Sequence, residues 1–488
     1  MSLRESPFPN KFVEGVHSVG WVLIFPCFWY LDRLIAVCKS TTKEQAERKE
    51  QECYLHPLKV FFGSIVFFIF FVLTAPLAFL GLLLWAPLQA CRRPFTYHKE
   101  APTSLEMETH RGFEIAGQAS LTFASGNLCL LPDSLARFNN LGHTLRRAST
   151  VGQLIVTSQS NYQSAPTGLP SQEQSEEPWE VLTSFPANLD ILCLEEVFDK
   201  RAAQKLTNIL KPVFGHILYD VGVYACQPPC RCSSFKFFNS GMFFASRFPV
   251  LQAQYHWFPN SSGEDALAAK GLLSAKVLIG QNQSRKKVVG YFNCTHLHAP
   301  EGDGRIRCEQ LDMVASWIAD FQAANKQPEE EVVFDVLCGD FNFDNCSPDD
   351  TLEQNHGLFE EYRDPCRAGP GKEKPWVIGT LLEQPTMYED EVNTAENLKR
   401  TLETEELRKQ YISPPVAAEG FPLVYPETGQ PWIGRRLDYI LYRESSVSKL
   451  YRTDIEAVTY ITQLAGLTDH IPVGLRLKVT MDSSCNDV

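Results

Sequence analysis

The sequence of 488 residues lacks an excess of positive charge: 45 Lys and Arg residues stand against 58 Asp and Glu residues, and the formal net charge is −13 at pH 7. Residues 1–100 hold 11 basic and 8 acidic residues, so the remaining 388 residues hold 34 and 50, a net charge of −16. Proteins that bind nucleic acid do so mainly by neutralising phosphates with Lys and Arg. An acidic body of this kind makes nucleic acid an unexpected partner.

Familiar nucleotide and zinc motifs are also missing. The sequence contains neither GxxxxGK[ST] nor GxGxxG, so nothing predicts nucleotide binding by those phosphate-binding loops. Its 15 cysteines form no regular framework, and the close group Cys226, Cys230 and Cys232 has no second ligand pair at a spacing typical of zinc. We therefore interpret these three residues as ordinary thiols, and the scattered, odd number of cysteines indicates a reducing compartment for the body.

Long apolar runs are abundant near the start of the chain. They cover residues 15–38, where only Asp32 and Arg33 are charged, and residues 60–91, which carry no charge. A bilayer core about 30 Å thick is crossed by about 20 helical residues. Helices of soluble proteins have one apolar stripe, whereas the second run is apolar on all sides. We therefore expect residues 1–100 to be an α-helical membrane-associated region.

Basic residues flank the second apolar run on both sides, within residues 39–59 and 92–99. The positive-inside rule favours a cytosolic position for both flanks. Two helical hairpins that enter one leaflet and return satisfy this rule, so we favour them slightly over membrane-spanning helices. The two alternatives stay open at this point.

Residues 101–488 have the pattern of one α/β domain. Apolar strand-like runs alternate with helical stretches such as residues 307–324, which predicts two packed β-sheets with helices outside them. The strand-like runs include residues 188–199, 235–250, 286–300, 330–344, 435–443 and 466–479. Residues 158–178 are polar and almost without large apolar side chains, so we expect a flexible, exposed insertion there.

Polar residues gather in or beside these strand-like runs. They are Asn127, Glu196, His296, Asp340, Asn342, Asp438, Asp469 and His470. Loops at one edge of a sheet sandwich can bring such residues to a single site. Carboxylates and amides suit an octahedral Mg²⁺ site, and histidines supply acid–base chemistry near neutral pH. Taken singly, each residue also fits a structural role in a turn.

Six short motifs occur together and in a fixed order: E-E-V, N-S-G-x-x-F-A-S-R, T-H-L-H, G-D-F-N, R-x-D-Y and T-D-H. This order resembles the magnesium-dependent phosphodiesterases with the deoxyribonuclease-I-like fold, a four-layer α/β sandwich. The longer segments FPANLDILCLEEVFDKRA, CTHLHAP, VLCGDFNFDNC and ITQLAGLTDHIPV are similar to the membrane-bound mammalian neutral sphingomyelinases. The similarity covers nearly the whole chain. The short polar insertion resembles the shorter, mitochondria-associated member of that family.

The resemblance implies roles for the residues around a metal ion. Glu196 corresponds to the principal ligand of Mg²⁺, or alternatively Mn²⁺, and Asn127 assists at the metal or the phosphate. Asp340 and Asn342 position the attacking water and a phosphate oxygen. Glu195 stands where relatives often have Gln, so it is left out of the predicted site.

The resemblance also implies the acid–base and substrate-binding groups. His470 is the general base, and Asp438 holds its imidazole. His296 binds the phosphate and stabilises charge in the transition state, and Asn239 contacts the phosphate. A positioned base contributes about 10²–10⁴-fold to the rate of such a reaction.

A further pair, Asp265 and Lys270, is implied to be regulatory. It corresponds to a mobile element beside the site that couples catalysis to membrane lipid. At a spacing of five residues the two side chains are not ideal neighbours on a helix, so an exposed loop without such a role is the alternative.

The expected function is Mg²⁺-dependent hydrolysis of membrane sphingomyelin to ceramide and phosphocholine. The alternative is an inositol-phospholipid phosphatase or another phosphodiesterase of the same fold; a nuclease is disfavoured by the acidic body, and a catalytically inactive scaffold by the presence of every expected residue. The weakly basic residues 1–100 predict anionic phospholipids as activators. We expect an intracellular membrane, mitochondrial and/or endoplasmic reticulum, with a cytosol-facing catalytic domain. The sequence carries no indication of oligomeric state.

Overall fold

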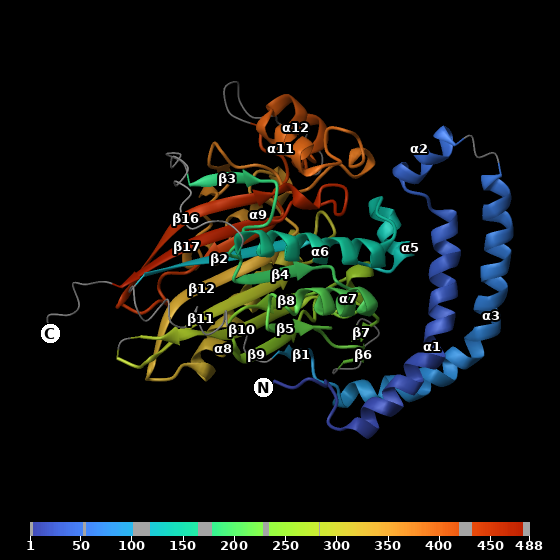
Figure 1. Cartoon of the computed structure of the whole chain (residues 1–488), viewed down its shortest axis with the longest axis horizontal. Coiled ribbons are helices and arrows are strands. Elements are labelled where there is room, and N and C mark those ends of the chain that lie inside the picture. Colours follow the sequence, from blue (N-terminus) through green and yellow to red (C-terminus); the bar gives the residue numbers. More distant parts are fainter. Residues whose placement is uncertain are drawn as a thin grey trace.

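Two β-sheets packed face to face, with helices on both outer faces, form the body of the protein in the computed structural model (Figure 1). The structure describes residues 3–51, 55–100, 118–163, 178–227, 234–282, 284–418 and 432–481. The predicted four-layer α/β sandwich of mixed sheets is confirmed.

The larger sheet has eight strands in the order β1–β5–β8–β4–β2–β17–β16–β3. They are β1 (Thr96–Lys99), β5 (His216–Tyr219), β8 (Phe243–Ser246), β4 (Ile191–Glu195), β2 (Gln118–Asn127), β17 (Val473–Met481), β16 (Tyr451–Ile461) and β3 (Trp179–Leu182). Strand β1 pairs antiparallel with β5, with Thr96 opposite Tyr219. The end of the predicted N-terminal region therefore contributes an edge strand to the body.

The smaller sheet has five strands in the order β15–β12–β11–β10–β9. They are β15 (Asp438–Tyr442), β12 (Glu330–Asp340), β11 (Lys287–His296), β10 (Gly271–Gln281) and β9 (Val250–Trp257). The aromatic rings of Phe123, Phe292 and Phe334 fill the space between the two sheets, and the centroids of Phe123 and Phe334 are 4.9 Å apart. Burial of this apolar layer holds the sheets together.

Helices cover the two outer faces. Helices α6 (Thr144–Gln163) and α7 (Lys200–Leu210) pack on the larger sheet, and α8 (Gly304–Asn325) packs on the smaller one. Side chains alternate along β4, so this strand contributes to two apolar layers. Leu192 faces the helices, and Cys193 faces the other sheet. Helix α6 includes the first residues of the insertion predicted at 158–178, and residues 164–177 lie outside the described residues.

Shorter elements lie between the strands and at their ends. They are α5 (Asp133–Ala136), α9 (Thr351–Gln354), α10 (Leu358–Glu361), α11 (Ala395–Glu403), α12 (Glu405–Tyr411), β6 (Ala225–Cys226), β7 (Phe235–Lys236), β13 (Arg367–Gly369), β14 (Lys372–Glu373), and the 3₁₀ helices η1 (Gln89–Cys91), η2 (Arg137–Asn139), η4 (Gly263–Leu267), η5 (Pro348–Asp350), η6 (Gln384–Thr386) and η7 (Thr462–Leu464).

The two apolar runs form one continuous helix each, α1 (Lys11–Cys38) and α3 (His56–Leu88), joined through α2 (Thr42–Glu50). Both are long and apolar enough to cross a membrane. The slightly favoured hairpin within each run is therefore wrong for this structure. Pro26 and Pro76 lie inside the helices without turning the chain back, because proline removes one helical hydrogen bond but not its neighbours.

Helix α1 lies between α3 and the body (Figure 1). The interruption of its apolar run has a structural purpose: the backbone N–H of Ser134 donates to Oδ1 of Asp32 over 2.8 Å, and the guanidinium of Arg33 lies 3.1 Å from Oδ2 of Asp133. The outward surface of α3 exposes a series of large apolar side chains, including Phe61, Phe62, Phe68, Leu73, Phe79 and Leu83. Helix α1 thus docks on the body, and α3 presents the apolar surface that suits lipid.

Two glycines allow α1 and α3 to approach closely. A Cβ atom at Gly81 would lie 2.6 Å from the carbonyl oxygen of Gly20 and 2.8 Å from Cβ of Leu23. Neither distance is compatible with a side chain, so the helix pair requires glycine at this crossing.

Substitution at this crossing tests the packing of the helix pair. We expect Gly81→Val to force the helices apart at a cost of about 1–3 kcal/mol and to speed amide hydrogen exchange of α1 around Leu23 by about tenfold. Mass-spectrometric exchange on protein in detergent micelles measures this effect. Gly15→Val is the control, because no atom of the described residues outside the adjoining helix backbone lies within 4 Å of the Cβ position there. Equal exchange in both variants would contradict the close contact.

Candidate active site

The predicted polar residues meet where strands of both sheets end. In the larger sheet, Asn127 closes β2 beside Glu195, the last residue of the parallel strand β4. In the smaller sheet, His296 and Asp340 are register partners at the ends of the parallel strands β11 and β12, and Asp340 also faces Asp438 at the start of β15. Strand ends are thus the reason that residues far apart in the sequence share one site.

A hydrogen bond joins the two sheets at this edge, since Nδ2 of Asn127 donates to Oδ2 of Asp340 over 2.9 Å. Nε2 of His296 lies 3.7 Å from Oδ2 of Asp340 and 4.0 Å from Oε1 of Glu196. The site therefore has a compact acidic centre built from β2, β11, β12 and the residue that follows β4.

This acidic centre fits a divalent cation. One ligand atom each of Glu196, His296 and Asp340 lies within 4.8 Å of the other two. Oε2 of Glu196 and both ring nitrogens of His296 are buried without a hydrogen-bond partner in the described part of the chain. Buried polar atoms normally have a hydrogen-bond partner. These oxygen and nitrogen atoms lack one and are therefore suited to bind a metal ion.

Burial also sets the protonation of the centre. It raises the pKa of Glu196 to about 7, although Lys270 acts in the opposite direction. Burial holds the pKa of His296 well below its ordinary value, so the ring is neutral and keeps a free lone pair. A bound cation favours the ionised carboxylate, and its binding is therefore coupled to loss of the Glu196 proton.

Glu196 itself stands on an unusual backbone. Its φ angle is 58°, in the left-handed region, and the next backbone N–H, that of Val197, donates to the carbonyl oxygen of Gly241 over 2.7 Å. A Cβ atom at Gly241 would lie 2.9 Å from Cα of Glu196, so only glycine permits this approach. The turn that aims Glu196 at the site therefore depends on the N-S-G segment.

His470 and Asp438 form a dyad beside the acidic centre. Nδ1 of His470 donates to Oδ2 of Asp438 over 2.9 Å, and the hydroxyl oxygen of Thr380 accepts from the backbone N–H of Asp438 over 3.2 Å. Burial acts to lower the pKa of His470, but the Asp438 carboxylate raises it well above its ordinary value. The dyad is the arrangement expected of an oriented base.

Two predicted residues make contacts that hold loops in place. Nδ2 of Asn342 donates to the carbonyl oxygen of Leu297 over 3.0 Å, and its backbone N–H donates to Oδ1 of Asp340 over 2.9 Å. Asn239 donates from Nδ2 to Asp220 over 3.2 Å and accepts from Gly241 over 3.0 Å. In this structure both amide groups therefore bind protein atoms around the site.

Asp220, which the sequence did not single out, anchors that second loop. It forms ion pairs with Arg92 at 2.7 Å and Lys200 at 3.1 Å. Although burial acts to raise the pKa of Asp220, Arg92 and Lys200 hold it well below its usual range. Arg92 follows the membrane helices and binds a loop of the active site, so the N-terminal region and the site are directly connected.

Asp265 and Lys270 are paired beside the site. Their carboxylate and ammonium groups lie 2.9 Å apart, and Lys270 also donates to the carbonyl oxygen of Leu297 over 3.2 Å. Asp265 accepts from the backbone N–H of Ala299 over 2.8 Å. The pair thus binds the loop that follows His296.

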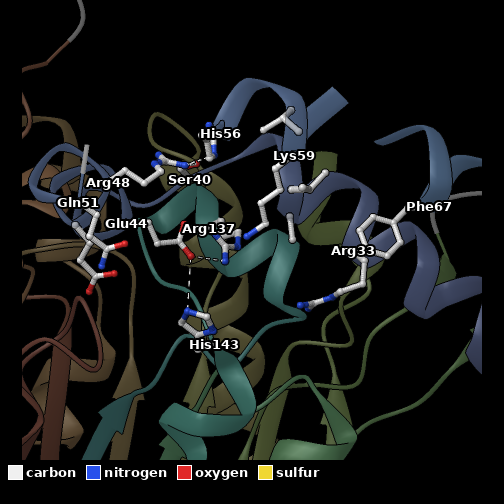
Figure 2. Close-up of a pocket in the computed structure, with 14 residues that line it drawn as sticks. Arg33, Ser40, Glu44, Arg48, Gln51, His56, Lys59, Phe67, Arg137 and His143 are labelled. Carbon is white, nitrogen blue, oxygen red and sulfur yellow. Dashed lines mark hydrogen bonds and ion pairs between the residues drawn. The ribbon is translucent and has the colours of Figure 1, made fainter. Parts of the chain in front are cut away.

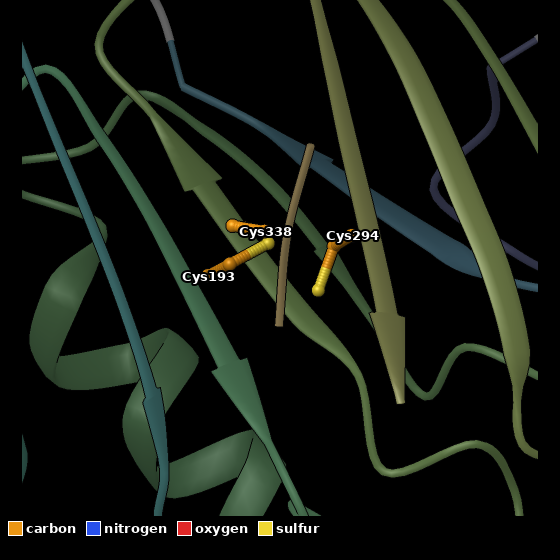
Figure 3. A group of neighbouring side chains, drawn as sticks. All are labelled: Cys193, Cys294 and Cys338. Atoms are coloured by element: carbon orange, nitrogen blue, oxygen red, sulfur yellow. The ribbon is translucent and has the colours of Figure 1, made fainter. Parts of the chain in front are cut away.

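Two further carboxylates lie near the site: Glu195, which was left out of the predicted site, and Asp469, which was named without a role. Glu195 is fully buried, with Ser125 donating to its Oε1 over 2.8 Å. Asp469 accepts from Gln384 over 2.9 Å. Three buried thiols from separate strands also converge below the site: Cys193, Cys294 and Cys338 (Figure 3). The sequence did contain a signal for this cluster: each cysteine precedes a polar residue at a strand end by two positions, and side chains two positions apart on a strand face the same side.

Comparison with known proteins gives consistent matches. Residues 12–91 match the neutral sphingomyelinase N-terminal transmembrane region, and residues 174–470 match the endonuclease/exonuclease/phosphatase family. The chain is 57% identical to sphingomyelin phosphodiesterase 5 of Danio rerio, over 100% of both chains. It is 35% identical to sphingomyelin phosphodiesterase 3 of Homo sapiens, over 98% of this chain and 99% of that one. The solved structure of Staphylococcus aureus beta toxin with bound magnesium ions is 16% identical, covers 75% of this chain and 100% of that chain, and has a TM-score of 0.41.

The dyad yields a titration test. Asp438→Asn removes the negative charge that raises the pKa of His470, so the ring is expected to titrate at lower pH. An NMR titration of the histidine rings measures the shift, with His470→Ala identifying the signal. Asp454→Asn on the exposed part of β16 is the control, and it should leave the His470 titration unchanged. An unshifted pKa in Asp438→Asn would contradict the electrostatic role of Asp438.

Proposed function

This chain belongs to the neutral sphingomyelinase family, and we propose that it hydrolyses sphingomyelin to ceramide and phosphocholine with Mg²⁺, or alternatively Mn²⁺, in the acidic centre. Full-length identity of 57% to a sphingomyelin phosphodiesterase is the observation that carries the proposal. The meeting of Glu196, His296, Asp340, Asp438 and His470 at one edge of the sandwich supports it.

In the proposed reaction Glu196 is the main metal ligand, and Asn127 assists through its bond to Asp340. When bound, the ion supplies positive charge that polarises the phosphate and neutralises the alkoxide that leaves as ceramide. His296 lies at the same centre, and its ring nitrogens have no hydrogen-bond partner in the described structure. We assign His296 to the phosphate, where it stabilises the charge that develops in the transition state.

The proposed nucleophile is a water activated by His470. Its Nδ1 is held by Asp438, which orients the ring and makes it a stronger base. Asp340 and Asn342, which share a hydrogen bond, are assigned to positioning the water and a phosphate oxygen. Asn239 is assigned to a phosphate contact. These roles divide proton transfer, orientation and charge stabilisation among different side chains.

The charge around the site favours a substrate with a single phosphate and a cationic headgroup. Lys270 and Lys200, which lie beside the site, are paired with Asp265 and Asp220. An inositol-phospholipid phosphatase, the alternative of the same fold, needs unpaired basic groups for the additional phosphates. The acidic body suits the choline group better.

The membrane region brings the enzyme to its substrate. In this proposal residues 1–100 are the membrane-associated region, with β1 belonging to the sheet of the body, and residues 101–488 are the phosphodiesterase domain. The exposed apolar surface of α3 enters the lipid, and the domain faces the cytosol at a mitochondrial and/or endoplasmic reticulum membrane. The Asp265–Lys270 pair is proposed to couple the site to membrane lipid through the loop after His296.

Purified full-length protein in mixed micelles provides the functional test. With Mg²⁺ it is expected to release phosphocholine from sphingomyelin, and removal of Mg²⁺ by a chelator should abolish the release. His470→Ala is expected to lower kcat by about 10²–10⁴-fold, because the water loses its base. His356→Ala, outside the site, should change kcat by no more than about twofold. Equal hydrolysis of phosphatidylcholine would refute the sphingolipid assignment, and full activity of His470→Ala would refute the assigned base.

A basic cavity in the N-terminal region supports the proposal that anionic phospholipids activate the enzyme. The cavity has a volume of about 370 Å³ and lies among α1, α2, α3 and the turn at Arg137, as Figure 2 shows. Arg137 is paired with Glu44 at 2.6 Å. Arg48 and Lys59 also line the cavity, and neither has a carboxylate partner in the described residues. These two cations are suited to an anionic headgroup.

Charge reversal at the cavity tests this activation. On vesicles that contain anionic phospholipid, Lys59→Glu is expected to lower sphingomyelin hydrolysis by about five- to tenfold, since each basic residue near an anionic surface contributes about 1 kcal/mol. Activity on neutral micelles should remain unchanged. Lys326→Glu, an exposed change after α8, is the control with the same change of charge. Equal activation of both variants by anionic vesicles would contradict a role for the cavity.

A further inference from the structure

Three buried thiols form a cluster directly below the active site. Cys193 of β4, Cys294 of β11 and Cys338 of β12 are at most 1% exposed, and their sulfur atoms all lie within 4.8 Å of one another. Figure 3 shows the side chains pointing into the space between the two sheets. Alternation along the strands places Cys294 and Cys338 on the same face as His296 and Asp340, two residues or about 7 Å deeper.

A carboxylate lies beside the thiol cluster, in contact with one of its three sulfur atoms. Glu195 is fully buried, and the thiol of Cys294 lies 3.3 Å from its Oε1. Its other oxygen, Oε2, has no hydrogen-bond partner, and Glu195 takes part in no ion pair within the described residues. Burial raises the pKa of Glu195 well above its ordinary value, so the ionised carboxylate requires a positive charge such as a bound cation beside it.

The donor set has the chemistry of a zinc site. Thiolates bind soft cations, and tetrahedral Zn²⁺ takes Cys sulfur as its main structural ligand and accepts a carboxylate oxygen as well. Sulfur atoms at a Zn–S distance of about 2.3 Å are about 3.8 Å apart, so the three thiols need to contract only slightly. We propose that Cys193, Cys294, Cys338 and Glu195 bind a structural Zn²⁺ ion, separate from the cation at Glu196.

Such an ion would connect the two halves of the sandwich beneath the reaction centre. Cys193 and Glu195 belong to the larger sheet, and Cys294 and Cys338 to the smaller one. Coordination releases the thiol protons to water as the ion binds. The four bonds fix the spacing of β4, β11 and β12 just before Glu196, His296 and Asp340, and therefore the geometry of the acidic centre.

Burial of all four ligands distinguishes this site from the active-site cation. An ion at full burial enters while the sheets are closing and does not exchange with solvent in the folded protein. A chelator that removes the active-site cation from native protein should therefore leave the zinc in place. Unfolding in the presence of the chelator should release it.

Metal analysis of the full-length protein tests the site without reference to activity. Protein expressed with zinc in the medium and dialysed against chelator in the native state is expected to retain about one equivalent of Zn²⁺. Expression with Co²⁺ instead should give the intense visible bands of tetrahedral cobalt and a thiolate-to-cobalt charge-transfer band. Less than about a tenth of an equivalent of zinc, or a cobalt spectrum without the thiolate band, would overturn the proposal.

Variants assign the metal to these ligands. Glu195→Gln keeps the shape of the side chain and is expected to lower zinc retention by at least about tenfold, as is Cys338→Ser. Cys366→Ser is the matched control, because Cys366 is also buried but contacts Tyr460 instead of the cluster. Circular dichroism verifies that each variant is folded. Full zinc retention in folded Cys338→Ser would overturn the proposal, as would a disulfide within the cluster in freshly purified native protein.

Discussion

The active site depends on the closure of two sheets at one edge, where Asn127 from the larger sheet donates to Asp340 from the smaller one. Because side chains alternate between the two faces of each strand, the residues that face the other sheet form successive layers below this edge. The outermost layer holds Asn127, His296 and Asp340, and the layer beneath holds Ser125, Cys294 and Cys338. A change in register of a single residue would replace both layers with side chains that face the helices. The aromatic layer around Phe123 fixes that register more deeply in the sandwich.

Burial at this edge raises the energetic cost of each polar group that lacks a partner. Within the part of the chain that the structure describes, Glu196 and His296 keep buried atoms without hydrogen-bond partners. The same burial shifts the pKa of Glu196 to about 7 and that of His296 downward. Asp438 acts oppositely on His470, because a direct charge–charge contact outweighs desolvation. Neighbouring side chains therefore differ in protonation because their surroundings differ. This difference allows one to act as base, another as metal ligand and a third to stabilise charge.

Much of the sandwich and of the site followed from the sequence, because strand periodicity and the motifs at strand ends are local signals. Glu196, His296, Asp340, Asp438 and His470 were predicted on that basis and lie together. The remainder depended on tertiary contacts without a local signature. The role of Asp220 arises from Arg92 and Lys200, which come from other segments. The hairpins expected in the apolar runs rested on flanking charge, which carries no information on whether a helix continues through proline.

The N-terminal helices have a second role that their hydropathy alone does not indicate. Asp32 interrupts the apolar run of α1, yet it is 3% exposed and accepts from the backbone of Ser134. Arg92, just after the helices, donates to the carbonyl oxygens of Asp220 and Gly222 over 2.7 and 2.8 Å. Asp220 also binds Asn239, and Gly241 in the same loop binds the backbone of Val197, next to Glu196. A displacement of the helices relative to the body therefore reaches the turn at Glu196 through direct contacts. Membrane attachment and active-site geometry are therefore parts of one connected structure.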